Sequence, residues 1–161
     1  MLFKLNMPKK ISRTTVSAAT HRLTLQIERP HAVVWRGFTR DICLWWPKDF
    51  FASSSPKRMV FELKPGGRLY EDSGDGNGLV WYQVSALDAP NSITLSGFIA
   101  PPFGGPAVSL LHVSFSAKGK SATLMDVTDS TLGCVDEAAT AEGWRLLFQE
   151  GFKAWIERNR R

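Results

Sequence analysis

The sequence has little of what metal sites, disulfide frameworks and membrane anchors require. Its 161 residues include only two cysteines and three histidines. Cys43 and Cys134 lie far apart and match no metal-binding spacing, which favours two reduced thiols in a cytoplasmic protein. No apolar run approaches the roughly 20 residues of a membrane-spanning helix. These absences predict a protein that holds no metal or cofactor and does not insert into a membrane.

The net charge of +5 is concentrated at the two ends of the chain. Four Lys or Arg residues lie among the first 13 positions, which contain no acidic residue, and three arginines lie among the last four positions. Terminal basic runs are usually solvated. No stretch alternates aromatic with basic side chains, as a stacking platform for bases would. We therefore expect no nucleic-acid binding.

Residues 1–19 are polar, basic and weakly patterned, and they contain no continuous apolar segment of the kind found in signal peptides. They are interpreted as a flexible leader or as a weakly patterned first strand. Residues 20–161 are assigned to one domain. A chain of this length buries roughly 70% of its unfolded surface, so it supports a core without disulfides.

A strand followed by two short helices is predicted at the start of this domain. Residues 21–28 alternate apolar and polar side chains, which indicates a strand with one buried face. Residues 31–38 have helical spacing, and Thr39 is expected to cap a second helix. One face of that helix would carry Phe38, Ile42, Trp45 and Trp46 until Pro47 ends it.

Six further strands are predicted between residues 58 and 131, because short alternating runs are separated by turn sequences such as KPGGR, SGDGNG and APPFGGP. No helical crossover separates them, so the sheet should be antiparallel. From Asp136 the period changes. One face of a long helix, reaching about residue 158, is formed by Trp144, Leu147, Phe148, Phe152, Trp155 and Ile156.

This order of elements predicts a cavity. A single helix cannot cover the concave face of a seven-stranded sheet from edge to edge, so a pocket should remain between helix and sheet. Gly143 and Gly151 lie within the helix, where each costs about 1 kcal/mol relative to alanine. They indicate room for something to approach the helix.

Four stretches carry a family resemblance: VVWRGFTRDICLWWP, FELKPGGRLYE, LDAPNSITLSGF and EGWRLLFQEGFKAW. In this order they resemble the START-like (SRPBCC) superfamily and, within it, bacterial proteins similar to the C-terminal domain of the activator of the heat-shock-protein-90 ATPase. The resemblance covers about residues 20–158. It implies an α+β helix-grip fold in the order β-α-α-β6-α, with a curved seven-stranded antiparallel sheet around the C-terminal helix. That fold hosts lipid carriers, hormone receptors, polyketide aromatases and cochaperones, so it does not specify a function.

The resemblance also implies which strand residues face the helix, namely Leu69, Glu71, Trp81, Ile93, Leu95, Gly97, Met125, Val127 and Asp129. Related proteins often carry a bulky aromatic side chain near Gly97. Either the cavity is larger at this position, or the glycine marks a β-bulge or a kink.

Glu71 and Asp129 are the candidate polar groups of the cavity. An ionised carboxylate in an apolar cavity is unfavourable unless it is paired or hydrated, so each would mark an anchor for a ligand. The alternative is that each lies at the cavity mouth or bonds a neighbouring strand. No catalytic residue is predicted, because His112 should point outward and no nucleophile lies beside a base.

The stretch RDICLWWPKDFF places two tryptophans before Pro47 and two phenylalanines after it. Phe50 and Phe51 are predicted to form a movable lid, hinged by the polar SSSPKR sequence, while Trp45 or Trp46 turns into the core. The alternative is that all four rings are core that closes one end of the domain.

The favoured function is binding of a small hydrophobic or amphipathic molecule in the cavity. The alternatives are a chaperone-interacting regulatory module and an enzyme of the polyketide cyclase or aromatase type. A chaperone partner has no support from particular residues, and a homodimer is left open. The predicted ligand-binding residues are Trp45, Trp46, Phe50, Phe51, Glu71, Trp81, Leu95, Gly97, Met125, Val127, Asp129, Gly143, Leu147 and Gly151.

Overall fold

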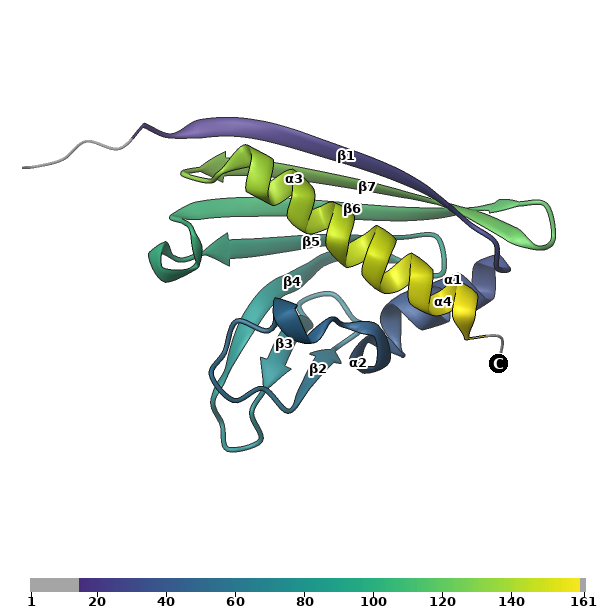
Figure 1. Ribbon diagram of the computed structural model, residues 1–161, viewed down its shortest axis with the longest axis horizontal. Helices are drawn as coiled ribbons and strands as arrows, with labels where there is room; N and C mark the ends of the chain where they lie inside the picture. Colours follow the sequence, from purple (N-terminus) through teal and green to yellow (C-terminus); the bar gives the residue numbers. More distant parts are fainter. Residues whose placement is uncertain (1–14, 160–161) are drawn as a thin grey trace, which may run out of the picture.

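The computed structural model describes residues 15–159, and its seven strands form one antiparallel sheet. The strands are β1 (Ser17–Ile27), β2 (Arg58–Phe61), β3 (Arg68–Asp72), β4 (Gly78–Asp88), β5 (Ser92–Ile99), β6 (Ala107–Lys118) and β7 (Ala122–Gly133). Their order across the sheet is β1-β7-β6-β5-β4-β3-β2. The C-terminal helix lies across one face of this sheet (Figure 1). The predicted α+β helix-grip architecture is confirmed.

β1 begins earlier than its alternating pattern predicts. It starts at Ser17 and pairs with β7 along its whole length, from Ser17 opposite Gly133 to Ile27 opposite Thr123. The first residues of the strand are exposed or half-buried, so they carry no apolar alternation that would reveal them. Residues 17–19 therefore extend the first strand, and residues 1–14 of the predicted leader lie outside the described residues.

Two short helices and a single 3₁₀ turn connect β1 to β2. They are α1 (His31–Thr39), α2 (Ile42–Trp45) and η1 (Lys48–Phe50). The predicted cap of the second helix is wrong. Thr39 is the last residue of α1, and its hydroxyl donates to the Trp35 carbonyl at 2.7 Å. Because that hydroxyl is used within α1, it does not cap α2, which begins after Asp41 without a side-chain cap.

The C-terminal helix is continuous from Glu137 to Arg158. It consists of α3 (Glu137–Arg145), a π-helical segment η3 (Leu146–Lys153) and α4 (Ala154–Arg158). Asp136 caps its start by accepting a hydrogen bond from the Ala139 N–H at 3.0 Å. Another short 3₁₀ turn, η2 (Pro101–Phe103), lies between β5 and β6.

The core lies between the sheet and the C-terminal helix, and the predicted facing of the strands is confirmed. Of the nine strand residues expected to face the helix, Trp81 is half-buried and the other eight are buried. The largest fully buried apolar side chains come from both layers: Phe148, Phe152, Ile27, Ile93, Leu95 and Met125. The concave face of the sheet is therefore the side that carries the core and the cavity.

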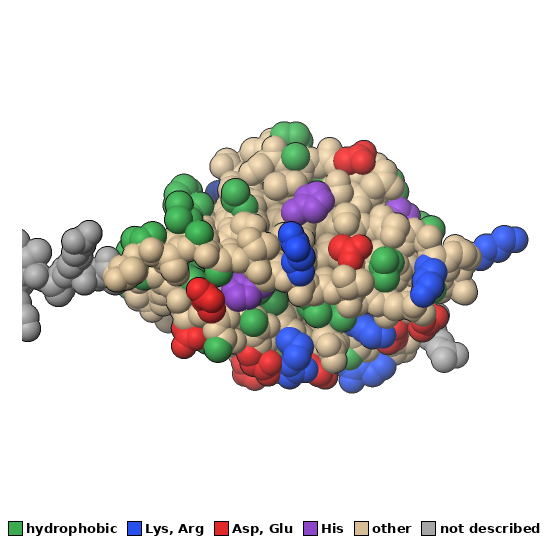
Figure 2. All heavy atoms as spheres, turned by 90° about the horizontal axis from the view of Figure 1, so that it is seen from above, with side chains coloured by type: hydrophobic (Ala, Val, Ile, Leu, Met, Phe, Trp, Pro, Cys, Tyr) green, Lys and Arg blue, Asp and Glu red, His purple; other side chains and the backbone are tan. Residues whose placement is uncertain are grey.

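The described surface has a balanced charge. All 15 acidic residues but only 14 of the 20 basic residues lie within residues 15–159. Basic and acidic side chains are interspersed on the face shown in Figure 2. Cys43 is exposed, Cys134 is half-buried, and both are free thiols. No helix within residues 15–159 is both long and apolar enough to cross a membrane.

Candidate functional site

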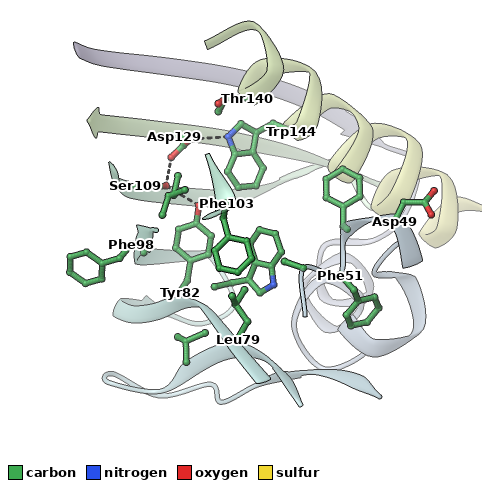
Figure 3. Close-up of a pocket in the computed structure, with 16 residues that line it drawn as sticks. Asp49, Phe51, Leu79, Tyr82, Phe98, Phe103, Ser109, Asp129, Thr140 and Trp144 are labelled. Carbon is green, nitrogen blue, oxygen red and sulfur yellow. Dashed lines mark hydrogen bonds between the residues drawn. The ribbon is translucent and has the colours of Figure 1, made fainter. Parts of the chain in front are cut away.

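A cavity of about 390 Å³ lies between the sheet and the first part of the C-terminal helix. We call it the aromatic pocket, because seven of its sixteen lining residues carry aromatic rings. They are Phe50, Phe51, Trp81, Tyr82, Phe98, Phe103 and Trp144. The other lining residues are Asp49, Ala52, Leu79, Val80, Gly97, Ile99, Ser109, Asp129 and Thr140. Figure 3 shows rings from the sheet, the helix and the η1 region around this space.

Four consecutive residues of β4, Leu79 to Tyr82, line the pocket, and a β-bulge lies among them. Leu69 of β3 pairs with Tyr82, and Tyr70 pairs with Val80, so Trp81 is an extra residue in β4. Neighbouring residues of a regular strand point to opposite faces, but a bulge interrupts this alternation. Trp81 and Tyr82 therefore both line the pocket. The alternating pattern alone predicts only Trp81.

A chain of buried hydrogen bonds crosses one end of the pocket. The Tyr82 hydroxyl lies 2.8 Å from the Ser109 hydroxyl, which donates to Asp129 Oδ1 at 2.5 Å. Trp144 Nε1 donates to Asp129 Oδ2 at 2.8 Å. These residues come from β4, β6, β7 and α3, and Figure 3 shows them in line. Asp129 is therefore a buried carboxylate whose two oxygens both have partners, and it lines the pocket as predicted.

Tyr82 keeps its proton in this environment. Burial and the charge of Asp129 raise the pKa of the Tyr82 hydroxyl well above its ordinary value of 10, although the hydrogen bond with Ser109 acts in the opposite direction. The phenol is therefore neutral throughout the physiological pH range.

Glu71 does not line the pocket, although it is buried and faces the helix as predicted. Its carboxylate accepts hydrogen bonds from Ala52 N at 2.7 Å, Ser53 N at 2.8 Å and Trp81 Nε1 at 2.8 Å. Burial alone would raise the pKa of Glu71, but the hydrogen bonds from Ser53, Ala52 and Trp81 outweigh it and lower the pKa. Glu71 thus holds the segment after Phe51 against the sheet.

The four rings around Pro47 divide into two groups. Trp45 is buried, donates from Nε1 to the Gly37 carbonyl at 2.9 Å, and packs on Phe152 with ring centroids 4.9 Å apart. Trp46 is also buried in the core. Phe50 and Phe51 are half-buried and line the aromatic pocket. Pro47 therefore separates two core rings from two pocket rings.

Several other predicted site residues lie away from the aromatic pocket. Leu95, Met125 and Leu147 are packed in the core. Val127 lines an adjoining cavity of about 260 Å³ between β1 and α3, which shares Asp129 and Trp144 with the aromatic pocket. Neither Gly143 nor Gly151 lines the aromatic pocket.

The three glycines singled out by the sequence have different surroundings. A Cβ atom on Gly143 would meet no atom within 4 Å, whereas one on Gly151 would lie 3.1 Å from Pro47 Cγ. Gly151 therefore makes room for Pro47. A Cβ on Gly97 would lie 2.5 Å from the Trp81 carbonyl and 2.9 Å from the Tyr82 ring. Gly97 lines the pocket, but the predicted extra space is filled by Tyr82.

Gly97 does not mark a kink either. It lies within β5 and pairs with Ser109 of β6 in an unbroken register. Gly97 therefore allows close packing of Tyr82, and its pairing with β6 contains no bulge.

Sequence reasoning missed Tyr82, Ser109 and Trp144 as site residues. A signal existed for Ser109, because it lies two residues before Leu111 on the strand face that was expected to point inward. The sequence predicts Trp144 on the apolar face of the helix, and that pattern does not reveal its bond to Asp129. The bulge that turns Tyr82 inward left no sequence signal of its own.

No protein-family model matches the chain, and no curated protein matches its sequence. Solved structures do match its fold. The Mll3558 protein from Rhizobium loti is 20% identical, with a TM-score of 0.65 over 84% of this chain and 96% of that chain. CalU16 from Micromonospora echinospora is 17% identical, with a TM-score of 0.58 over 89% and 84% of the two chains. The AHSA1-like protein from Aeromonas hydrophila is 18% identical, with a TM-score of 0.55 over 85% and 92%.

At these identities the likeness shows the fold alone. The chain has the helix-grip architecture that its four sequence stretches predict, a seven-stranded antiparallel sheet with the C-terminal helix across one face.

Proposed function

We propose that this protein binds a small, neutral, largely apolar ring compound in the aromatic pocket. The observation that carries the proposal is a cavity of about 390 Å³ with aromatic rings in its walls and a buried polar chain across one end. Small-molecule sites typically measure about 300–1,000 Å³, with apolar walls and a few placed polar groups. The aromatic pocket has this composition.

Ring compounds suit these walls, because aromatic pairs stack in offset or edge-to-face geometry. One ring of the pocket wall already packs in this way against another ring of the protein. Trp144 stacks on Phe148 with centroids 5.3 Å apart and planes at 6°, which leaves Trp144 held in a fixed orientation at the pocket wall. A rigid wall of this kind reduces the entropy lost on binding.

The polar groups favour binding over catalysis. Ser109 donates to Asp129 at 2.5 Å, but each of these residues is only 1% exposed. A nucleophile must reach the reacting atom of a bound substrate, and this buried hydroxyl is not open to one. The proposal therefore assigns the pocket to ligand binding, while the chaperone and cyclase alternatives have no comparable observation among the described residues.

Titration with the neutral fluorescent probe N-phenyl-1-naphthylamine tests this proposal. We expect saturable binding that is at least about tenfold weaker in Phe51→Ala, since that ring lines the pocket. Phe61→Ala is the matched control, because Phe61 is also half-buried but lies outside the pocket lining. Its affinity should stay within about twofold of wild type.

Absence of saturable probe binding to the folded wild-type protein would contradict the proposal. Equal losses of affinity in both variants would also contradict it, because they would place the probe elsewhere. Native mass spectrometry of freshly purified protein can then identify a retained natural ligand.

A further inference from the structure

The side chains that could donate hydrogen bonds from the wall of the aromatic pocket already donate them within the protein. Two indole N–H groups and one hydroxyl are used in this way: Trp81 donates to Glu71, Trp144 to Asp129, and Thr140 to the Asp136 carbonyl, each at 2.8 Å. A donor that has a good internal partner is not free to bind a ligand without losing that bond.

The remaining two hydroxyls, those of Tyr82 and Ser109, form a chain in which every hydrogen bond is donated toward Asp129. An O–H group carries a single hydrogen. Ser109 gives its hydrogen to Asp129 Oδ1, so the Tyr82 hydroxyl must be the donor in its 2.8 Å bond with Ser109. The raised pKa of Tyr82 keeps that proton in place. The Tyr82 oxygen is then left with lone pairs only.

The charged groups of the pocket have one sign. Asp49 and Asp129 line it, and none of its lining residues is a lysine, arginine or histidine. Asp49 is exposed and Asp129 is buried, so a ligand carboxylate inside the pocket would lie near the buried acid Asp129 without a basic side chain of the lining to pair with. Bringing an anion into such a site is unfavourable.

We infer that the pocket selects neutral ring compounds carrying a hydroxyl or N–H group, which is donated to the Tyr82 oxygen, and that it rejects carboxylates. This inference rests on the proposed function and adds the polarity of the ligand. Tyr82 is the natural contact, because Ser109 and Asp129 are each only 1% exposed whereas Tyr82 is 6% exposed.

Three naphthalenes of similar shape test this inference by displacement of N-phenyl-1-naphthylamine. 2-Naphthol can donate a hydrogen bond, 2-methoxynaphthalene can only accept one, and 2-naphthoate is an anion. For wild type we expect 2-naphthol to bind at least about tenfold more tightly than 2-methoxynaphthalene. The ether oxygen of 2-methoxynaphthalene and the Tyr82 oxygen are both acceptors, so no hydrogen bond forms between them in the buried pocket. 2-Naphthoate should bind most weakly.

Asp129→Asn should reverse the direction of hydrogen-bond donation along the chain of Tyr82, Ser109 and residue 129. The Trp144 N–H requires the amide oxygen, so the amide nitrogen faces Ser109 and donates to it. Ser109 then donates to Tyr82, whose hydrogen becomes free for the ligand. The preference for 2-naphthol over 2-methoxynaphthalene should fall at least about tenfold, and 2-naphthoate should gain affinity.

Tyr82→Phe provides a second variant, with folding of both checked by circular dichroism. It removes the proposed acceptor, so it should also lower the preference for 2-naphthol while 2-methoxynaphthalene binds as before. Wild type that binds N-phenyl-1-naphthylamine but does not distinguish the three naphthalenes would overturn the inference and leave the proposed function standing. An unchanged preference in folded Tyr82→Phe would overturn it as well. Failure of wild type to bind the fluorescent probe would instead count against the proposed function.

Discussion

At the scale of single residues, the two buried acids have different tasks. Asp129 contributes to the pocket wall, whereas Glu71 binds two backbone N–H groups and one indole N–H outside it. Both carboxylate oxygens of Glu71 accept hydrogen bonds, whereas a glutamine at this position has only one acceptor oxygen. Its NH₂ group would face an N–H donor and leave that donor without a partner. We expect Glu71→Gln to lower the free energy of unfolding by about 2–3 kcal/mol in urea denaturation.

Glu62→Gln is the matched control for that experiment, because Glu62 pairs with Arg68 at the surface and no buried donor depends on it alone. It should change stability much less than Glu71→Gln. If the two variants lose the same stability, Glu71 does not hold the segment after Phe51.

The lowered pKa of Glu71 also predicts how stability depends on pH. A carboxylate with a lowered folded-state pKa stabilises the protein above its unfolded value, here 4.5, and this contribution is lost as pH falls through the folded-state value. The stability difference between wild type and Glu71→Gln should therefore be largest near neutral pH and shrink below pH 4.5. A constant difference across this range, measured by urea unfolding, would contradict the assigned ionisation of Glu71.

At the scale of elements, the C-terminal helix contains two glycines with opposite surroundings. A side chain on Gly151 meets Pro47 at 3.1 Å, while one on Gly143 meets open space. We expect Gly151→Leu to lose about 1–3 kcal/mol of stability through overpacking. Gly143→Leu should be neutral or stabilising by up to about 1 kcal/mol, because leucine favours helix more than glycine does.

Thermal unfolding measures the stability of both variants, which carry the same substitution at two positions of one helix. Neither glycine lines the aromatic pocket, so folded Gly143→Leu should retain wild-type affinity for N-phenyl-1-naphthylamine. Weaker probe binding in this variant would mean that the ligand reaches Gly143, as the sequence suggested.

At the scale of the whole molecule, the sequence predicts the fold better than the site. Alternation and helical spacing report which face of an element is buried, so the order of elements, the antiparallel sheet and the inward strand residues follow from them. The bulge at Trp81 breaks that alternation, and the partners of Glu71 are backbone N–H groups that no side-chain pattern reveals. The predicted site residues consequently include core residues, and they do not include Tyr82 and Ser109 of the pocket lining.

The pocket joins the sheet, the C-terminal helix and the η1 region, so a ligand there should bind only the folded chain and stabilise all three together. A ligand at about 100 times its Kd adds about 2.7 kcal/mol to the free energy of unfolding. For a chain of this size that corresponds to a rise in Tm of roughly 5–11 °C. We expect this rise for wild type with N-phenyl-1-naphthylamine. At the same probe concentration Phe51→Ala should show a clearly smaller rise, because its higher Kd reduces saturation and the unfolded chain offers no pocket. Equal rises in both proteins would show that the probe stabilises the fold from a site that Phe51 does not reach.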